Sequence, residues 1–124
     1  MEVEGQFSAA HVIHGYQGAC NRLHGHNYRI LVRLAGEELD KLGMLIDYAA
    51  VKRALTEVIA PLDHAYLNDL ESFAAANTTS EEIARYLYHR LQETLLNTDD
   101  LRRRVRLTEV MVYETGRQGV GYGE

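Results

Sequence analysis

Residues 24–34 read His-Gly-His-Asn-Tyr-Arg-Ile-Leu-Val-Arg-Leu. Every second position from the tyrosine onward is apolar: Tyr28, Ile30, Val32 and Leu34. Alternation with a period of two is typical of a strand with one buried face. Counting back by twos from Tyr28 reaches His26 and His24, so both imidazoles share the face that carries the core residues. The stretch therefore predicts a strand with two neighbouring histidines beside the core.

An earlier stretch, residues 2–11, follows the same period. Its apolar face consists of Val3, Phe7, Ala9 and His11, and its polar face of Glu2, Glu4, Gln6 and Ser8. A loop rich in glycine and polar residues, residues 15–21, separates it from the second strand. We therefore predict a pair of adjoining strands in which His11 lies on the apolar face.

Two amphipathic helices are predicted in the middle of the chain. From Asp47 to about Pro61 the apolar residues form one stripe, made of Val51, Leu55, Val58 and Ile59, and the proline ends the helix. The second helix covers residues 80–96, with Ile83, Leu87, Leu91 and Leu95 four residues apart. Thr79 followed three residues later by Glu82 is typical of a capping box at its start.

The last part of the chain predicts a hairpin. Residues 105–114 are rich in β-branched and aromatic side chains, which favour a strand. Residues 116–119 contain two glycines and indicate a turn, and a short strand follows around Val120 and Tyr122.

The predicted order is strand, strand, helix, helix, strand, strand, without internal repeats. This order favours an α+β fold in which two helices cover one face of a four-stranded antiparallel sheet. A chain of 124 residues is expected to form a single domain over residues 1–124. The two open sheet edges favour pairing with further copies, so we expect a ring-like homo-oligomer.

Composition and charge argue against several classes of protein. The formal net charge is −5, and the one dense basic cluster consists of Arg102, Arg103, Arg104 and Arg106. Nucleic acid is therefore not an expected partner. The single cysteine cannot form an internal disulfide, and the sequence has neither a signal-peptide pattern nor a spanning apolar stretch. We expect a cytoplasmic protein with no membrane partner.

His11, His24 and His26 together suggest a metal site. Two of them project from one face of a strand, and His11 on the adjoining strand can supply a third nitrogen. Three imidazoles and an open fourth position are typical of catalytic zinc, and neutral imidazole suits that ion. The alternative is that these histidines are hydrogen-bonded core residues, as a bare His-x-His pair often is.

Other residues suggest acid–base chemistry. Cys20 lies in the loop four residues before His24, where a thiol can reach a metal-bound substrate, and a nearby cation favours the thiolate. The alternative for Cys20 is a small inert hydrophobic residue. Asp63 next to His64 places a carboxylate beside an imidazole that could serve as acid or base. The alternative is that Asp63 caps a turn.

Three further residues could bind a substrate. Glu114 ends the last long predicted strand, and a buried carboxylate there can accept paired hydrogen bonds from an amino-heterocycle. Otherwise it is a solvent-facing strand end. Thr79 and Ser80 offer hydroxyl groups at a helix start, where they also suit the plain role of helix caps.

Six motifs, spread over nearly the whole chain, resemble the 6-pyruvoyl-tetrahydropterin synthase family. They are Phe-Ser-Ala-Ala-His (7–11), Cys-Asn-Arg-Leu-His-Gly-His-Asn-Tyr (20–28), Gly-Met-Leu-Ile-Asp-Tyr (43–48), Leu-Asp-His-Ala-Tyr-Leu-Asn (62–68), Thr-Thr-Ser-Glu (78–81) and Tyr-Glu-Thr (113–115). The Cys-x-x-x-His-Gly-His element is the most specific. The family includes bacterial 6-carboxy-tetrahydropterin synthase.

The resemblance implies the tunnelling fold, in which small α+β subunits join their sheets into a barrel, as a trimer or hexamer, with active sites at subunit interfaces. It implies zinc on His11, His24 and His26. Cys20 is then the proton-abstracting residue, and Asp63 and His64 are its proton-transfer partners. The same likeness makes Glu114 the anchor of a pterin ring, with help from Thr79 and Ser80.

The implied substrate is 7,8-dihydroneopterin triphosphate, with Arg22 and Arg117 as candidates for holding the triphosphate. We expect the carboxy-forming reaction, which releases triphosphate and acetaldehyde for the queuosine and 7-deazaguanine pathway, because the chain is short. The pyruvoyl-forming enzyme is the alternative, and a non-catalytic zinc- or pterin-binding module is a second. A third branch of the family uses a glutamate at or next to the cysteine position. Here Asn21 follows Cys20, which argues against that branch.

Overall fold

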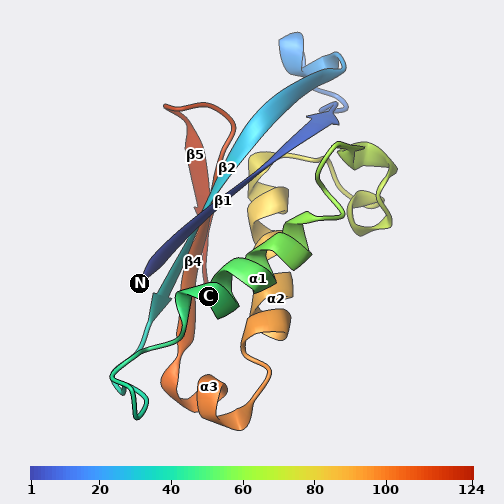
Figure 1. Ribbon diagram of the computed structural model, residues 1–124. Helices are drawn as coiled ribbons and strands as arrows, with labels where there is room; N and C mark the ends of the chain where they lie inside the picture. The colour runs from blue at the N-terminus through green and yellow to red at the C-terminus, as the bar shows by residue number, and fades with distance from the viewer.

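The computed structural model describes residues 1–124 and contains one mixed sheet with helices on one side (Figure 1). Strands β1 (Glu2–His11), β2 (His24–Ala35), β4 (Arg106–Tyr113) and β5 (Gly119–Tyr122) pair antiparallel along the sheet. A fifth strand, β3 (Ala65–Tyr66), lies parallel to β1 at its outer edge, so that the order is β3-β1-β2-β4-β5.

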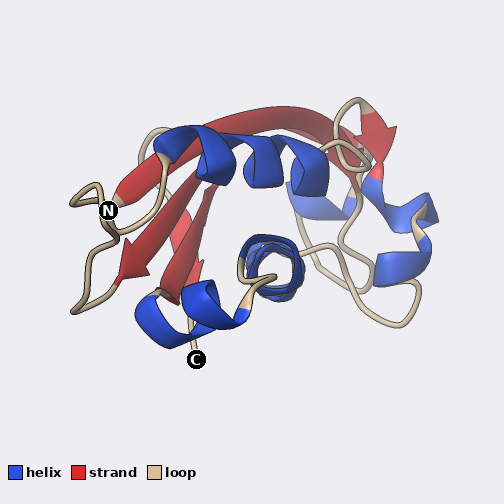
Figure 2. Ribbon diagram, turned by 60° about the horizontal axis from the view of Figure 1, so that its bottom comes forward, coloured by secondary structure: helices blue, strands red, loops and turns tan.

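Two long helices cover the same face of the sheet, as predicted. Helix α1 (Tyr48–Ile59) packs on β1, and α2 (Ser80–Leu95) packs on β4 and β5. Figure 2 shows both helices on the inner side of the curved sheet. The side chains of Asp47 and Thr79 cap them by accepting hydrogen bonds from the backbone N–H groups of Ala49 and Glu82, which satisfies amides that have no partner within the helix.

The core lies between this sheet face and the two helices. The even-numbered strand residues Tyr28, Ile30 and Val32 are fully buried there, which confirms the period-two prediction. The helical stripes supply the opposite wall, with buried residues that include Val51, Leu55 and Val58 in α1 and Ile83, Leu87 and Leu91 in α2. Burial of these apolar side chains provides the main stabilisation of the fold.

Two parts of the fold prediction were wrong. The sheet has five strands, because β3 adds a parallel edge strand of two residues that pairs only with Ala9 and Ala10. A third helix, α3 (Asp99–Arg104), precedes β4, and the hydroxyl of Thr98 caps it. Both elements are too short to show the periodicity from which a strand or helix is predicted. Short 3-10 turns also occur at Ala19–Asn21, Leu67–Asp69 and Glu71–Phe73.

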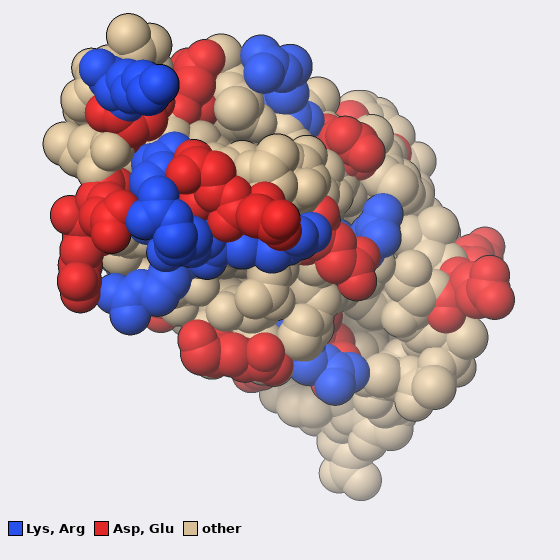
Figure 3. Space-filling model, turned by 90° about the horizontal axis from the view of Figure 1, so that it is seen from below, with Lys and Arg blue, Asp and Glu red and all other residues tan.

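Three arginines of the basic cluster, Arg102, Arg103 and Arg104, lie in α3 and pair with acidic side chains, whereas Arg106 begins β4. Arg104 is almost buried and donates to Asp100 and to the carbonyl of Leu45, while Arg102 lies 3.2 Å from Asp99. Figure 3 shows basic and acidic groups side by side on the face seen from below. The cluster therefore stabilises the end of α3. None of the helices has the length and apolar character needed to span a membrane.

Candidate active site and metal centre

The three histidines meet where β1 ends beside the start of β2. His11 and His24 are partners in the antiparallel register, and His26 lies two residues farther along the same face of β2. Their potential ligand atoms all lie within 4.8 Å of one another, and the two nearest, Nε2 of His11 and Nε2 of His24, are 2.9 Å apart. Strand register alone therefore brings three imidazoles together.

Backbone carbonyls determine which ring nitrogen is free. Nδ1 of His11 lies 2.7 Å from the carbonyl oxygen of Thr78, and Nδ1 of His24 lies 2.7 Å from that of Arg22. A carbonyl can only accept, so each Nδ1 carries the hydrogen and each Nε2 presents a lone pair. Such backbone contacts are typical of metal-binding histidines.

His26 supplies the observation that favours a metal over the alternative of core histidines. Its Nε2 is the one buried side-chain nitrogen or oxygen in the chain without a hydrogen-bond partner. Buried polar atoms are nearly always paired, and two lone pairs facing each other at 2.9 Å favour a cation between them. The donor set, three neutral nitrogens, fits zinc.

Burial disfavours the charged form of two of the three imidazoles, those of His11 and His26. Burial lowers the pKa of His11 below its usual value, and burial also lowers the pKa of His26. The carboxylate of Glu114 lies 4.0 Å from Nε2 of His11 and 3.8 Å from Nε2 of His26, beyond hydrogen-bond distance. Beneath them Tyr28 is fully buried, and burial raises the pKa of its phenol. A neutral imidazole is the form that binds a metal.

A cavity of about 550 Å³ joins several of the predicted residues. Its lining includes Cys20 from the 3-10 turn, Thr79 and Ser80 from the start of α2, Glu114 from the end of β4, and Arg117 from the following turn. Cavities of this size bind small organic ligands. The side chain of Glu114 is 28% exposed and lies directly after the last residue of β4. Thr79 both lines this cavity and caps α2.

Asp63 and His64 lie elsewhere. His64 lines a different groove, together with Ser8 and Gly25. Ala9 and the cluster residue His26 also line this groove. Neither Asp63 nor His64 lines the Cys20 cavity. One copy of the chain therefore does not bring the pair to that cavity.

Asp63 and His64 are nonetheless held in a defined geometry. Asp63 Oδ1 accepts the backbone N–H of Ser8 at 3.0 Å, and it lies 3.0 Å from Nδ1 of His64. The N–H of Ser8 is the main reason why the pKa of Asp63 is lowered. His64 has a positive φ of 55° and an 82% exposed side chain. A strained backbone that presents an exposed imidazole beside a carboxylate suggests a functional role.

The 6-pyruvoyl tetrahydropterin synthase family model matches residues 1–124. The chain belongs to this family. One relative of this chain is the 6-carboxy-5,6,7,8-tetrahydropterin synthase of Bacillus subtilis, which is 36% identical to it over 113 residues. That match covers 87% of this chain and 73% of the relative.

Two further likenesses agree. A putative 6-carboxy-5,6,7,8-tetrahydropterin synthase of Archaeoglobus fulgidus is 38% identical over 103 residues, which cover 83% of this chain and 81% of the relative. Among solved structures, the 6-pyruvoyl tetrahydropterin synthase of Caenorhabditis elegans superposes with a TM-score of 0.86 at 31% identity. That superposition covers 100% of this chain and 94% of the solved chain. The fold of the family therefore extends over the whole chain.

Two residues around the histidines, Thr78 and Asn68, were not among the predicted site residues. Thr78 is fully buried and accepts from His11, and the side chain of Asn68 contacts both Thr78 and the backbone of Val12. Both residues lie inside motifs that resemble the family, but neither is a metal ligand or an acid or base by type. Only the folded loops reveal their contacts.

Proposed function

We propose that this protein is a zinc-dependent 6-carboxy-5,6,7,8-tetrahydropterin synthase, a lyase that acts on 7,8-dihydroneopterin triphosphate with loss of triphosphate and acetaldehyde. The observation that carries the proposal is the cluster of His11, His24 and His26, in which Nε2 of His26 is buried without a hydrogen-bond partner. The cluster lies close to Glu114, which lines the same cavity as the thiol of Cys20. The bacterial and archaeal relatives of that name support the carboxy-forming reaction. The family match supports an enzyme acting on a pterin.

The three histidines form the proposed metal centre. Their Nε2 atoms face one another, and the carbonyls of Thr78 and Arg22 fix the rings of His11 and His24. Zinc, when bound there, supplies Lewis acidity to an oxygen of the substrate side chain. The low pKa of His11 keeps its imidazole available as a ligand near neutral pH.

The cavity residues bind the substrate and move its protons in this proposal. Glu114 accepts paired hydrogen bonds from the amino-heterocycle of the pterin, and the hydroxyls of Thr79 and Ser80 line the same cavity. Cys20 acts as the base that removes a proton from the side chain. Arg117 lines this cavity, whereas Arg22 does not, so Arg117 is the better candidate for contacting the triphosphate.

Asp63 and His64 reach the thiol of a neighbouring copy in a homo-oligomer. Two features support this part of the proposal. Neither residue lines the Cys20 cavity, and the position of the pair is fixed by hydrogen bonds to Ser8 of β1 although the imidazole of His64 is exposed. The resemblance to the family implied sites at subunit interfaces in a trimer or hexamer. His64 then delivers or accepts the proton that Cys20 moves, and Asp63 orients its ring.

The experiment that tests the reaction uses the purified, zinc-loaded protein and 7,8-dihydroneopterin triphosphate. The pterin product is identified by mass spectrometry, and acetaldehyde is assayed separately. A carboxy-pterin together with acetaldehyde is the expected result and would support a role in the supply of 7-deazaguanines such as queuosine. A pyruvoyl product without a released carbon fragment would assign the sister reaction, which the likeness to the Caenorhabditis elegans structure keeps as the second candidate.

A further inference from the structure

The segment that follows the metal-cluster residue His11 is bound by side chains instead of by a strand. Strand β3 pairs with β1 only at Ala9 and Ala10, and it ends at Tyr66. The chain then turns into the 3-10 helix Leu67–Asp69. Continued in register, Asn68 would stand opposite Val12. The backbone of residues 12–14 therefore needs other hydrogen-bond partners beyond the end of β3.

Asn68 provides them with its side chain. Its Oδ1 accepts the N–H of Val12 at 2.9 Å, and its Nδ2 donates to the carbonyl oxygen of Val12 at 2.9 Å. Both amide atoms are thus used as a backbone peptide group would use them in a sheet. Ile13 is held from another direction, because its N–H donates to the carbonyl oxygen of Cys20 at 2.8 Å.

The same amide also contacts the group that orients His11. The hydroxyl of the fully buried Thr78 donates to Oδ1 of Asn68 at 3.2 Å. Its oxygen also lies 3.3 Å from Nδ1 of His11, and the carbonyl oxygen of Thr78 accepts from that Nδ1 at 2.7 Å. Asn68 is therefore connected to His11 along two routes, through the backbone of Val12 and through Thr78.

We propose that Asn68 is a positioning residue for the metal centre, which replaces the missing strand pairing at Val12 and, through Thr78, keeps Nε2 of His11 directed at the ion. This inference rests on the proposed role of the histidines as ligands. It goes beyond that role, because Asn68 touches neither the ion nor the substrate. Partners behind a ligand fix its ring orientation, and their loss weakens metal binding.

Asn77 offers a matched control within the same chain. Its Oδ1 accepts the N–H of His14 at 2.9 Å, and its Nδ2 donates to the carbonyl oxygen of His14 at 3.0 Å. It thus makes the same two backbone bonds two residues farther on, without a hydrogen bond to the hydroxyl of Thr78. Replacing Asn77 therefore tests how zinc binding responds when residues 12–14 lose backbone hydrogen bonds without loss of the contact to the Thr78 hydroxyl.

The test measures zinc affinity by competition with a chromophoric chelator, and the visible absorption of Co²⁺ in place of zinc. Asn68→Ala should raise the zinc Kd about 10- to 100-fold and change the Co²⁺ spectrum, since the ring of His11 is no longer fixed. Asn77→Ala should keep both close to wild type. Circular dichroism of the metal-free variants checks that they fold.

Two results would overturn the inference: an Asn68→Ala variant with the wild-type zinc Kd and Co²⁺ spectrum, or equal losses in Asn68→Ala and Asn77→Ala. If Asn68→Ala does not fold, Thr78→Val decides, because it keeps the carbonyl that accepts from His11 and removes the hydroxyl that links Asn68 to His11 and to the carbonyl oxygen of Val12. A smaller loss of zinc affinity in Thr78→Val supports the inference, and no loss overturns it. Failure of the wild type to bind zinc would instead reject the proposed metal centre itself.

Discussion

Two cavities of similar size lie near the two ends of β4. They differ in whether the buried polar groups at or beside them have hydrogen-bond partners. The Cys20 cavity, of about 550 Å³, includes Glu114 just beyond the strand. The second, of about 510 Å³, includes Arg106 and Leu107 at the beginning of the strand, and Tyr88 of α2 forms part of its wall. Volume alone does not distinguish them as binding sites.

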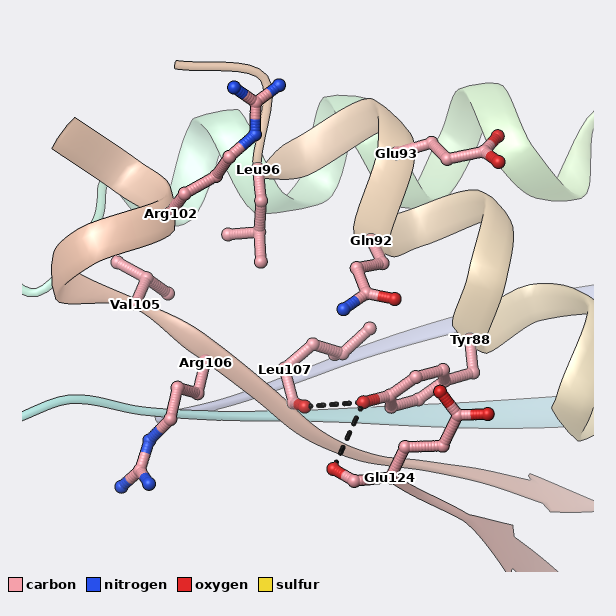
Figure 4. A pocket seen from close by; sticks show the side chains of 9 residues that line it. All are labelled: Tyr88, Gln92, Glu93, Leu96, Arg102, Val105, Arg106, Leu107 and Glu124. Carbon is pink, nitrogen blue, oxygen red and sulfur yellow. Dashed lines mark hydrogen bonds between the residues drawn. The ribbon is translucent and has the colours of Figure 1, made fainter. Parts of the chain in front are cut away.

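In the second cavity the buried hydroxyl group of Tyr88 has hydrogen-bond partners. The hydroxyl of Tyr88 lies 3.1 Å from the carbonyl oxygen of Leu107 and 3.4 Å from that of Glu124 (Figure 4). The guanidinium groups of Arg102 and Arg106 point away from each other, so they do not converge on a common ligand. By contrast, the Cys20 cavity adjoins the unpartnered Nε2 of His26 through Glu114. An unpartnered buried polar atom therefore distinguishes the end of the sheet where we propose the active site.

The largest expected effect on turnover is that of His24→Ala, a change in the histidine cluster beside the Cys20 cavity. It removes a metal ligand, so the protein should fail to retain zinc, and turnover should fall by roughly 10³-fold or more. Metal content by atomic spectroscopy and product formation are the two measurements. Cys20→Ala is the matched variant, which should keep its zinc and still lose about 10²- to 10⁴-fold in turnover. Equal loss of metal in both variants would contradict this division of roles.

A mixing experiment asks whether the reactive cavity is complete in one copy. Cys20→Ala and His64→Ala should each be inactive alone. Unfolding and refolding them together at equal concentration should restore activity in about a quarter of the sites, if Cys20 and His64 come from different copies. Cys20→Ala mixed with His24→Ala is the control, because both groups belong to one copy and no mixture restores them. Activity absent from both mixtures would argue that the pair does not act across an interface.

Glu114→Gln should have a smaller effect that is confined to binding. Replacing the carboxylate weakens the charge-assisted hydrogen bonds to the pterin, which corresponds to a pterin Kd about 10- to 100-fold higher. Titration with a product-like pterin, followed by fluorescence, measures it. The zinc content should stay near one ion per chain, since Glu114 lies 3.8 Å or more from the histidine nitrogens. Unchanged pterin affinity would remove Glu114 from the binding site.

The reactive end also shows how far sequence reasoning reaches. The period of two placed His24 and His26 correctly beside the core-facing residues, and the register of β1 and β2 confirmed that His11 joins them. The helices predicted from Asp47 to about Pro61 and over residues 80–96 are present at residues 48–59 and 80–95, since their apolar stripes are long enough to be recognised in the sequence. Periodic patterns report which side of an element faces the core.

Contacts between loops carry no such pattern. Asp63 and His64 are adjacent to a helix end in the sequence, yet the chain turns at His64 with a positive φ and leaves the imidazole exposed and outside the Cys20 cavity. The two amide bonds of Asn68 to Val12 depend on the exact place where β3 stops. The two-residue length of β3 is itself set by tertiary pairing with β1, which no local signal predicts.

The smallest expected effect belongs to the second cavity. Tyr88→Phe removes a hydroxyl that is hydrogen-bonded to the carbonyl of Leu107 in a buried position, so the free energy of unfolding should fall by about 1 kcal/mol. The kcat/KM and the zinc content should remain at wild-type values, because Tyr88 lines neither the histidine cluster nor the Cys20 cavity. Denaturant unfolding and steady-state kinetics on one preparation measure both. A large loss of turnover at unchanged stability would show that the second cavity takes part in function, and that satisfied polar groups do not mark an inactive end of the sheet.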